Sequence, residues 1–198
     1  MTVIEFYFDF LSPYSYLAFR IARVHFKNYK FIFKPVSLPH IINLSGNVPP
    51  ASLKVRGEYL VKDLQRSAEY YGIERETGRF KVPEIFPFDT RNYLYELVEM
   101  IDEGHKSAEE IDDFVMKTWI KIFHKGDISV GPEPLNKSNL KVLLLKNTEE
   151  ALKHGAFGVP FWRVINEKDE IETFFGSDRF HHMAKFIGID PLPFYSKL

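Results

Sequence analysis

The residues best suited to chemistry in this sequence form the run Ser12-Pro13-Tyr14-Ser15. Ser is favoured at the position before a helix and Pro at the first helical position, so Ser12 is predicted to cap a helix that begins at Pro13. The unpaired N–H groups and the dipole at the start of a helix stabilise negative charge. The Ser12 hydroxyl is therefore predicted to lie where an anion is stabilised, although an ordinary serine cap would have the same sequence.

Two regular elements must position this hydroxyl. Before it, apolar residues alternate with more polar ones from Ile4 to Phe10, which is the pattern of a strand. After it, apolar residues recur at helical spacing from Tyr14 to Val24. A strand, a short turn and a helix thus deliver Ser12 to the N-terminus of the helix.

Further strands are predicted on both sides of a long helical stretch. A second strand is expected over residues 30–38, where Pro35 indicates an edge position or the end of the strand. Because it follows a strand and a helix, a right-handed crossover is the default. Residues 159–165 and 171–175 are predicted to pair as a hairpin, and residues 180–187 to form the last helix.

The sequence between these strands is predicted to be helical. The expected helices are 51–71, 92–102, 107–122, 138–145 and 148–154, with a loop at 43–50, an irregular segment at 73–89 and a break at 125–134. Ser107 and Glu110 form a capping-box pattern. The order β-α-β, helical insertion, β-β-α defines an α/β protein. We predict one domain formed by residues 1–44 and 155–198, and an inserted helical domain at 45–154.

The composition limits the classes of function. The 198 residues include 19 Phe and are 45% hydrophobic, which is ample for a core. A net charge of −1 gives no reason to expect binding to nucleic acid or to an anionic membrane, and no apolar run is long enough for a membrane span. There are no cysteines, which excludes disulfides, thiolate metal sites and redox chemistry by the protein's own thiols. No metal site is predicted.

Five separated motifs occur in an order that resembles a known family. They are residues 8–17, 46–50, 59–64, 155–160 and 175–179. Together they resemble the kappa-class glutathione transferases and the related 2-hydroxychromene-2-carboxylate isomerases, which are similar in architecture to DsbA-type disulfide oxidoreductases. The resemblance covers nearly the whole chain, although the middle of the insertion matches poorly. It implies a thioredoxin-like fold with an inserted all-helical domain, in which Ser12 to Ser15 lie where redox members carry Cys-x-x-Cys.

The resemblance implies that glutathione binds around the first helix. Ser12, with Pro13 and Tyr14 beside it, matches the residue that contacts the glutathione sulfur. A hydroxyl and a helix N-terminus would both make the bound thiol ionise more easily. Pro160 matches the family's cis-proline, and Val159 is expected to pair like a strand with the cysteinyl part of glutathione. Base rates alone favour a trans proline that opens an edge strand.

The resemblance also implies contacts to the two ends of glutathione. Ser177 and Asp178 match the pair that holds the γ-glutamyl end, and the alternative for both is a plain helix cap. Asn47 matches a residue near the glycyl end, and it could equally support its own loop. Arg56 and Asp63 lie seven residues apart on one predicted helical face and match positions near the sulfur and the glutathione backbone. Family members often carry Lys in place of Arg56, and a solvated surface pair is the alternative.

The resemblance implies two possible reactions, and a third possibility is that the protein catalyses neither. The main expectation is a kappa-type glutathione transferase, whose glutathione thiolate attacks a small apolar electrophile in a cleft between the two domains. The runner-up is a glutathione-dependent isomerase. The short segment 46–54 and the absence of Lys next to Ile41 and Ile42 put its carboxylate-binding site in doubt. The third reading is a non-catalytic thioredoxin-like protein that binds peptides or partners.

The resemblance and the C-terminus give expectations for the oligomeric state and the location. The resemblance implies a homodimer. The sequence ends in Ser196-Lys197-Leu198, a peroxisomal address if the source is eukaryotic, and otherwise the protein is expected in the cytoplasm. The strand pattern begins almost at the first residue, so no signal or transit peptide is expected.

Overall fold

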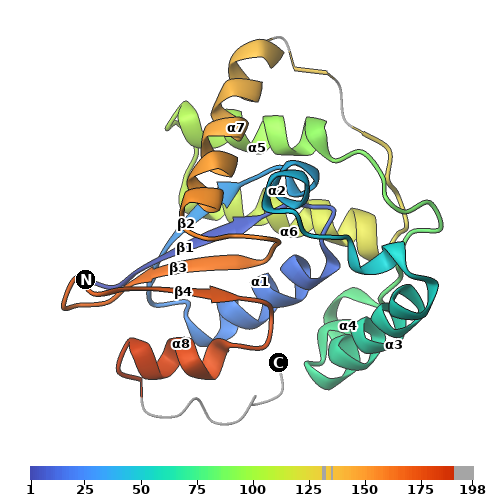
Figure 1. Cartoon of the computed structure of the whole chain (residues 1–198), viewed down its shortest axis with the longest axis horizontal. Coiled ribbons are helices and arrows are strands. Elements are labelled where there is room, and N and C mark those ends of the chain that lie inside the picture. Colours follow the sequence, from blue (N-terminus) through green and yellow to red (C-terminus); the bar gives the residue numbers. More distant parts are fainter. Residues whose placement is uncertain (131–132, 135, 190–198) are drawn as a thin grey trace.

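A four-stranded mixed sheet lies at the centre of the computed structural model, which describes residues 1–130, 133–134 and 136–189 (Figure 1). Its strands are β1 (Val3–Phe8), β2 (Lys30–Pro35), β3 (Phe161–Ile165) and β4 (Ile171–Phe175), in the order β2-β1-β3-β4. β1 pairs parallel with β2 and antiparallel with β3, and β3 pairs antiparallel with β4. The predicted β-α-β start and the C-terminal hairpin are therefore confirmed.

Helices cover both faces of this sheet (Figure 1). The helices of one face are α1 (Pro13–His25) and α8 (Phe180–Phe186), and those of the other are α2 (Leu38–Ser45) and α7 (Lys137–Lys153). Alternate residues of β1 point to opposite faces. Phe6 and Phe8 belong to the hydrophobic cluster on the α1 side, whereas Tyr7 belongs to a smaller cluster with Ile41 and Ala151. The central strand β1 is thus buried on both sides.

The remaining helices lie between β2 and β3 in the sequence. They are the 3-10 helix η1 (Pro50–Ser52) and the α-helices α3 (Lys54–Tyr70), α4 (Ile73–Thr77), α5 (Arg91–Asp102) and α6 (Ala108–Phe123). Trp119 of α6 is fully buried, and its ring centroid lies 5.1 Å from that of Phe8 and 5.3 Å from that of Phe19. The helical segment and the sheet therefore share one hydrophobic core. The division into two domains at residues 44 and 155 stays a prediction.

Several secondary-structure predictions were wrong in detail. β2 ends at Pro35 rather than at residue 38, and α2 then occupies part of the predicted loop at 43–50. The segment 73–89 contains α4. A single helix, α7, replaces the two short helices predicted over 138–154. The hydroxyl of Thr148, a residue that often interrupts a helix, donates instead to the Leu144 carbonyl within α7, at 2.7 Å.

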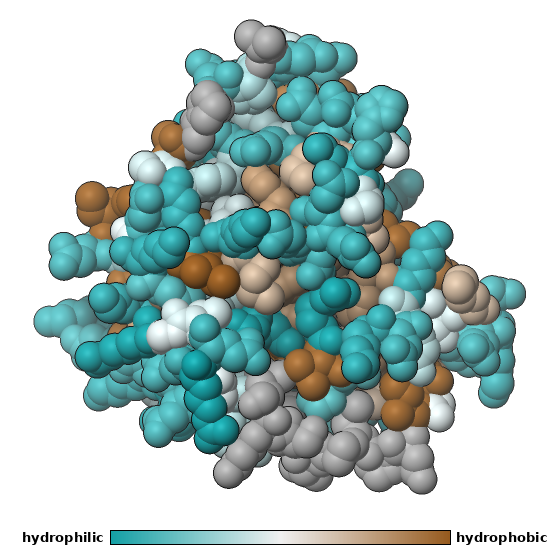
Figure 2. All heavy atoms as spheres, turned by 180° about the vertical axis from the view of Figure 1, so that it is seen from behind, coloured by the Kyte–Doolittle hydropathy of each residue, from teal (hydrophilic) through white to brown (hydrophobic). Residues whose placement is uncertain are grey.

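The face seen from behind is mostly hydrophilic, with hydrophobic side chains in small separate groups (Figure 2). Within the described residues, no helix combines the length and the apolar character that crossing a bilayer requires. The C-terminal tripeptide 196–198, on which the peroxisomal prediction depends, lies outside the described residues.

Candidate functional site

Ser12 caps α1, as its sequence predicts. Its backbone is extended, its hydroxyl oxygen accepts the Ser15 N–H at 3.1 Å, and Pro13 follows as the first helical residue. The same hydroxyl donates to the carbonyl oxygen of Val159 at 3.3 Å. Ser12 is 5% exposed, so its side chain lies at the inner end of the site rather than on an open surface. The cap and a contact with the loop before β3 are thus made by one oxygen atom.

The loop before β3 forms the opposite side of the site. The Val159–Pro160 peptide bond is cis, the isomer that the resemblance implies. The Pro160 carbonyl accepts the Gly176 N–H at 3.0 Å, which joins this loop to the end of β4. Among the described residues, the Val159 N–H has no hydrogen-bond partner. Val159 therefore offers a donor next to Ser12, together with a carbonyl that is held only by a long hydrogen bond.

Asn47 borders the same loop. Its amide nitrogen donates to the Phe157 carbonyl at 2.7 Å, and its amide oxygen accepts the Val48 N–H at 2.8 Å. The first bond joins the turn after α2 to the segment before the cis bond, 110 residues further along the chain. Asn47 therefore supports its loop, as the alternative interpretation proposed, and also borders the candidate site.

Tyr14 connects α1 to the helical segment. Its hydroxyl donates to Asp63 of α3 at 2.8 Å. Burial raises the pKa of Tyr14 well above its ordinary value, and the hydrogen bond to Asp63 and the nearby charge of Asp178 raise it further. Tyr14 therefore stays protonated and remains a hydrogen-bond donor. Arg56 lies two turns before Asp63 on α3, is exposed, and has no ion-pair partner within the described part of the chain.

Ser177 and Asp178 follow β4 but do not cap the next helix. The N-cap of α8 is Arg179, whose side chain makes no capping hydrogen bond. The alternative prediction, that Ser177 and Asp178 simply cap a helix, is therefore wrong. Asp178 forms an ion pair with Arg179, and its side chain is 65% exposed. Because its charge contributes to the raised pKa of Tyr14, Asp178 lies within electrostatic reach of the site.

Sequence reasoning missed Asp9 and Thr90. Asp9 directly follows β1, is fully buried, and accepts three hydrogen bonds, one of them from the Thr90 hydroxyl at 2.7 Å. Burial raises the pKa of Asp9, while the hydrogen bonds to its carboxylate act in the opposite direction. The sequence does contain a signal, a charged residue between Phe8 and Phe10. A carboxylate buried among apolar side chains needs hydrogen-bond donors, so Asp9 could have been predicted to bind other segments of the chain.

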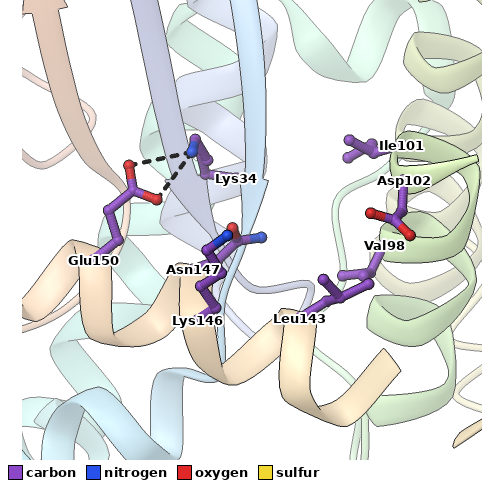
Figure 3. A pocket seen from close by; sticks show the side chains of 8 residues that line it. All are labelled: Lys34, Val98, Ile101, Asp102, Leu143, Lys146, Asn147 and Glu150. Carbon is purple, nitrogen blue, oxygen red and sulfur yellow. Dashed lines mark hydrogen bonds and ion pairs between the residues drawn. The ribbon is translucent and has the colours of Figure 1, made fainter. Parts of the chain in front are cut away.

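A cavity of about 260 Å³ lies away from Ser12 (Figure 3). It opens between β2, α5 and α7, and Lys34 and Glu150 form an ion pair of 3.0 Å at one side of it. None of the ten residues predicted for glutathione lines this cavity. The candidate site is instead the junction of the α1 N-terminus, the Val159–Pro160 loop and α3.

The fold and this junction define a thioredoxin-like protein in which serine stands at the first helix, where redox members carry cysteine. The model of the family described as DSBA-like thioredoxin domain matches residues 3–126, which is more than half of the chain. The chain therefore belongs to this family, and the expected thioredoxin-like fold is confirmed.

Individual proteins are similar to the chain, two of those named here over most of its length and one over about a third of it. Glutathione S-transferase kappa 1 of Caenorhabditis elegans is 29% identical, and the match covers 96% of this chain and 93% of the relative. Glutathione S-transferase kappa 1 of Rattus norvegicus is 27% identical, with coverages of 96% and 94%. The 2-hydroxychromene-2-carboxylate isomerase of Pseudomonas putida is 41% identical over 75 residues, which are 36% of this chain and 37% of that protein.

Solved structures agree on the fold. A structure of 2-hydroxychromene-2-carboxylate isomerase has a TM-score of 0.64 at 23% identity, and the match covers 94% of each chain. The cytosolic disulfide reductase DsbM from Pseudomonas aeruginosa has a TM-score of 0.57 at 9% identity, with coverages of 94% and 92%. At these identities the likeness is one of fold.

Proposed function

We propose that this protein is a glutathione transferase of the kappa type. Four relatives that match over most of its length carry that name, at 25–29% identity, whereas one such relative, at 23% identity, is named 2-hydroxychromene-2-carboxylate isomerase. One structural observation carries the proposal: the Ser12 hydroxyl lies at the N-terminus of α1 and faces Val159, in a chain without cysteine. Such a site suits a thiol that comes with the ligand, because the protein has none of its own.

The first task of the site is to ionise the glutathione thiol. The thiol proton leaves to solvent, and the negative charge on sulfur is stabilised by the α1 dipole and the N–H groups of its first turn. The Ser12 hydroxyl has one proton, which Val159 accepts at 3.3 Å. If the hydroxyl rotates so that this proton points to the sulfur, Ser12 loses its long neutral hydrogen bond to Val159 and gains a charge-assisted hydrogen bond to the thiolate.

The second task is to hold the peptide part of glutathione. The N–H and C=O of Val159 are proposed to pair with the cysteinyl residue in the manner of an added strand. Asp63, held by Tyr14, and Arg56 are proposed to bind at the α3 side of the ligand. Asn47 is assigned to the glycyl end. At the γ-glutamyl end, Ser177 is proposed to bind the carboxylate and Asp178 the ammonium group.

The bond-making step then needs no covalent help from the protein. The thiolate attacks an electrophilic carbon of a small apolar substrate, a carbon–sulfur bond forms, and the electron pair leaves with the displaced group or moves onto an acceptor atom that takes a proton from solvent. The protein contributes by orienting the thiolate and lowering the pKa of the thiol.

A glutathione-dependent isomerase is the second candidate. The observation that favours it is the 41% identity to the Pseudomonas putida isomerase, although that match covers only 36% of this chain. In this reaction the thiolate adds to the substrate, a bond rotates, and the thiolate leaves again. The two reactions share ionisation of the thiol and differ in whether glutathione stays on the product.

Calorimetry followed by product analysis tests these proposals. Saturable binding of reduced glutathione is expected, and S-methyl glutathione, which cannot ionise at sulfur, should bind more weakly. A mass increase on aromatic halides and conjugated carbonyls indicates transfer, whereas an unchanged mass with altered geometry on a cis-configured aromatic enone acid indicates isomerisation. An absence of saturable glutathione binding would favour the non-catalytic binding protein.

A further inference from the structure

The buried carboxylate of Asp9 joins three segments of the chain beside the candidate site. One of its oxygens accepts the Leu11 N–H at 3.0 Å and the Thr90 hydroxyl at 2.7 Å. The other accepts the Leu38 N–H at 2.9 Å. Asp9 is 0% exposed. Three donors from three segments therefore converge on one carboxylate that solvent does not reach.

Asp9 also holds the turn that delivers Ser12. The Ser12 N–H donates to the backbone carbonyl of Asp9 at 3.0 Å, and the Leu11 N–H donates to its side chain. Asp9 therefore fixes both Leu11 and Ser12, the last two residues before α1. Asp9 is fully buried and its carboxylate already accepts three donors, so it reaches a ligand through its hold on Ser12 and through its charge rather than by direct contact.

Thr90 is an unusual helix cap. It occupies the N-cap position of α5, where a threonine hydroxyl normally accepts an N–H of its own helix, yet it makes no side-chain capping bond. Its hydroxyl donates to Asp9 instead. Leu38, the third donor segment, is the first residue of α2. The turn before Ser12 is thus tied to the starts of two helices that are distant in sequence.

We propose that Asp9 and Thr90 are positioning residues that fix the Ser12 hydroxyl at the N-terminus of α1. This inference rests on the proposed function, in which that hydroxyl meets a thiolate. The influence of a helix N-terminus falls off within its first turn, so a small displacement of residue 12 weakens the stabilisation of negative charge there.

Thr90 gives a cleaner test than Asp9. Asp9→Asn would remove a negative charge near the site, which favours a thiolate, and would also break part of the hydrogen-bond set, which disfavours it. Thr90→Val keeps the carboxylate and the side-chain shape and removes only one donor. Thr148→Val is the matched control, because the Thr148 hydroxyl is also buried and accepts the Ser37 N–H beside Leu38 at 3.0 Å, without bonding to Asp9.

The chain has no cysteine, so Ser12→Cys introduces a single thiol whose pKa reports the site without any ligand. The pH dependence of its alkylation by iodoacetamide gives this pKa. Thr90→Val in that background should raise the pKa by about half a unit to one unit, which slows alkylation at low pH about three- to tenfold. Thr148→Val should leave it unchanged, and Thr90→Ser should restore most of the parental value.

Two results would overturn the inference: an unchanged thiol pKa in Thr90→Val, or an equal shift in Thr148→Val. If Thr90→Val does not fold, Thr90→Ser and Thr90→Ala replace it as a pair that differs by one hydroxyl. With the original Ser12, Thr90→Val should lower kcat and leave glutathione affinity within about twofold. If the parental protein does not bind glutathione, the proposed function fails, while the thiol introduced at position 12 still decides the positioning role.

Discussion

The Ser12 hydroxyl oxygen lies 3.3 Å from the carbonyl oxygen of Val159, although the two residues are 147 positions apart in the chain. One comes from the turn after β1 and the other from the loop before β3. A hydroxyl has one proton, so Ser12 cannot donate to this carbonyl and to a sulfur atom at once. In the proposed function, a glutathione thiolate that accepts the Ser12 proton therefore takes it from the Val159 carbonyl.

Ser12→Ala tests that exchange. The variant loses the donor to sulfur but keeps the α1 dipole and backbone N–H groups. A hydrogen bond to a charged group contributes about 1.5–3 kcal/mol, so the thiol pKa of bound glutathione should rise by about one to two units. Turnover should fall at neutral pH, while glutathione affinity changes much less. Thiolate absorbance of bound glutathione, titrated against pH, measures the shift.

Ser15→Ala is the matched control for this experiment. Ser15 lies in the same turn and is fully buried, but its hydroxyl has no hydrogen-bond partner within the described structure. Its removal should leave the thiol pKa unchanged. Ser12→Ala also loses a helix cap worth about 1 kcal/mol of stability, so titrations belong well below the unfolding temperature. Equal thiol pKa values in the parent and Ser12→Ala would reduce Ser12 to a helix cap.

Local patterns predict much of this fold. The cap at Ser12 and the capping box of Ser107 with Glu110 depend on residues within one helical turn, and both are confirmed. The errors occur where distant residues decide. At the start of α2, Thr148 accepts the Ser37 N–H and Asp9 accepts the N–H of the next residue, which adds distant partners to the local signal of a proline in the first turn. No window of sequence contains both partners.

The site was predictable in its members more than in its contacts. The motifs name Ser12, Val159 and Asp63, and the structure brings Ser12 into contact with Val159 and links Asp63 to the site through Tyr14. Periodicity and spacing do not indicate that Asp9 holds the turn before Ser12, since its partners come from three separate segments. Polar residues buried among apolar ones are the signal that such reasoning should follow.

Tyr14→Phe should weaken glutathione binding without changing the chemistry. It removes the 2.8 Å hydrogen bond that orients Asp63 and leaves the residues nearest the sulfur intact. Loss of one such bond corresponds to about 1 kcal/mol, or about fivefold in affinity. Calorimetry should show the higher dissociation constant, with the thiol pKa of bound glutathione as in the parent. Tyr29→Phe, beyond the far end of α1, is the control, and an unchanged dissociation constant in Tyr14→Phe would argue against Asp63 as a ligand.

Asp178→Ala tests the proposed contact with the glutathione ammonium group. A charge-assisted contact should lower affinity about tenfold or more when removed. The ion pair with Arg179 is exposed, and such pairs contribute little, so it should not prevent this contact. Arg179→Ala is the informative companion: freeing Asp178 should maintain or increase affinity. If Asp178→Ala folds and binds like the parent, the γ-glutamyl assignment is wrong.

His124 gives the fold a pH dependence independent of glutathione. Its Nδ1–H donates to the Gly78 carbonyl at 2.9 Å, so its Nε2 accepts the Tyr16 hydroxyl, also at 2.9 Å. Burial lowers the pKa of His124, and Arg20 lowers it further, whereas the hydrogen bond to Gly78 and the charge of Glu74 act in the opposite direction. The neutral ring therefore joins the segment after α4 to α1.

Acidification should weaken this connection. Because the pKa of His124 is lower in the folded protein than in the unfolded chain, the unfolded chain binds the extra proton first as the pH falls. The stability is fully present above the unfolded pKa of about 6.5 and declines below it, by at most about 1.4 kcal/mol per pH unit. Urea unfolding of His124→Gln between pH 5 and 7 should show a smaller decline than the parent, because Gln accepts the Tyr16 hydroxyl without titrating. His105→Gln, at an exposed position, should retain the parental slope, and equal slopes in all three proteins would exclude His124 as the source.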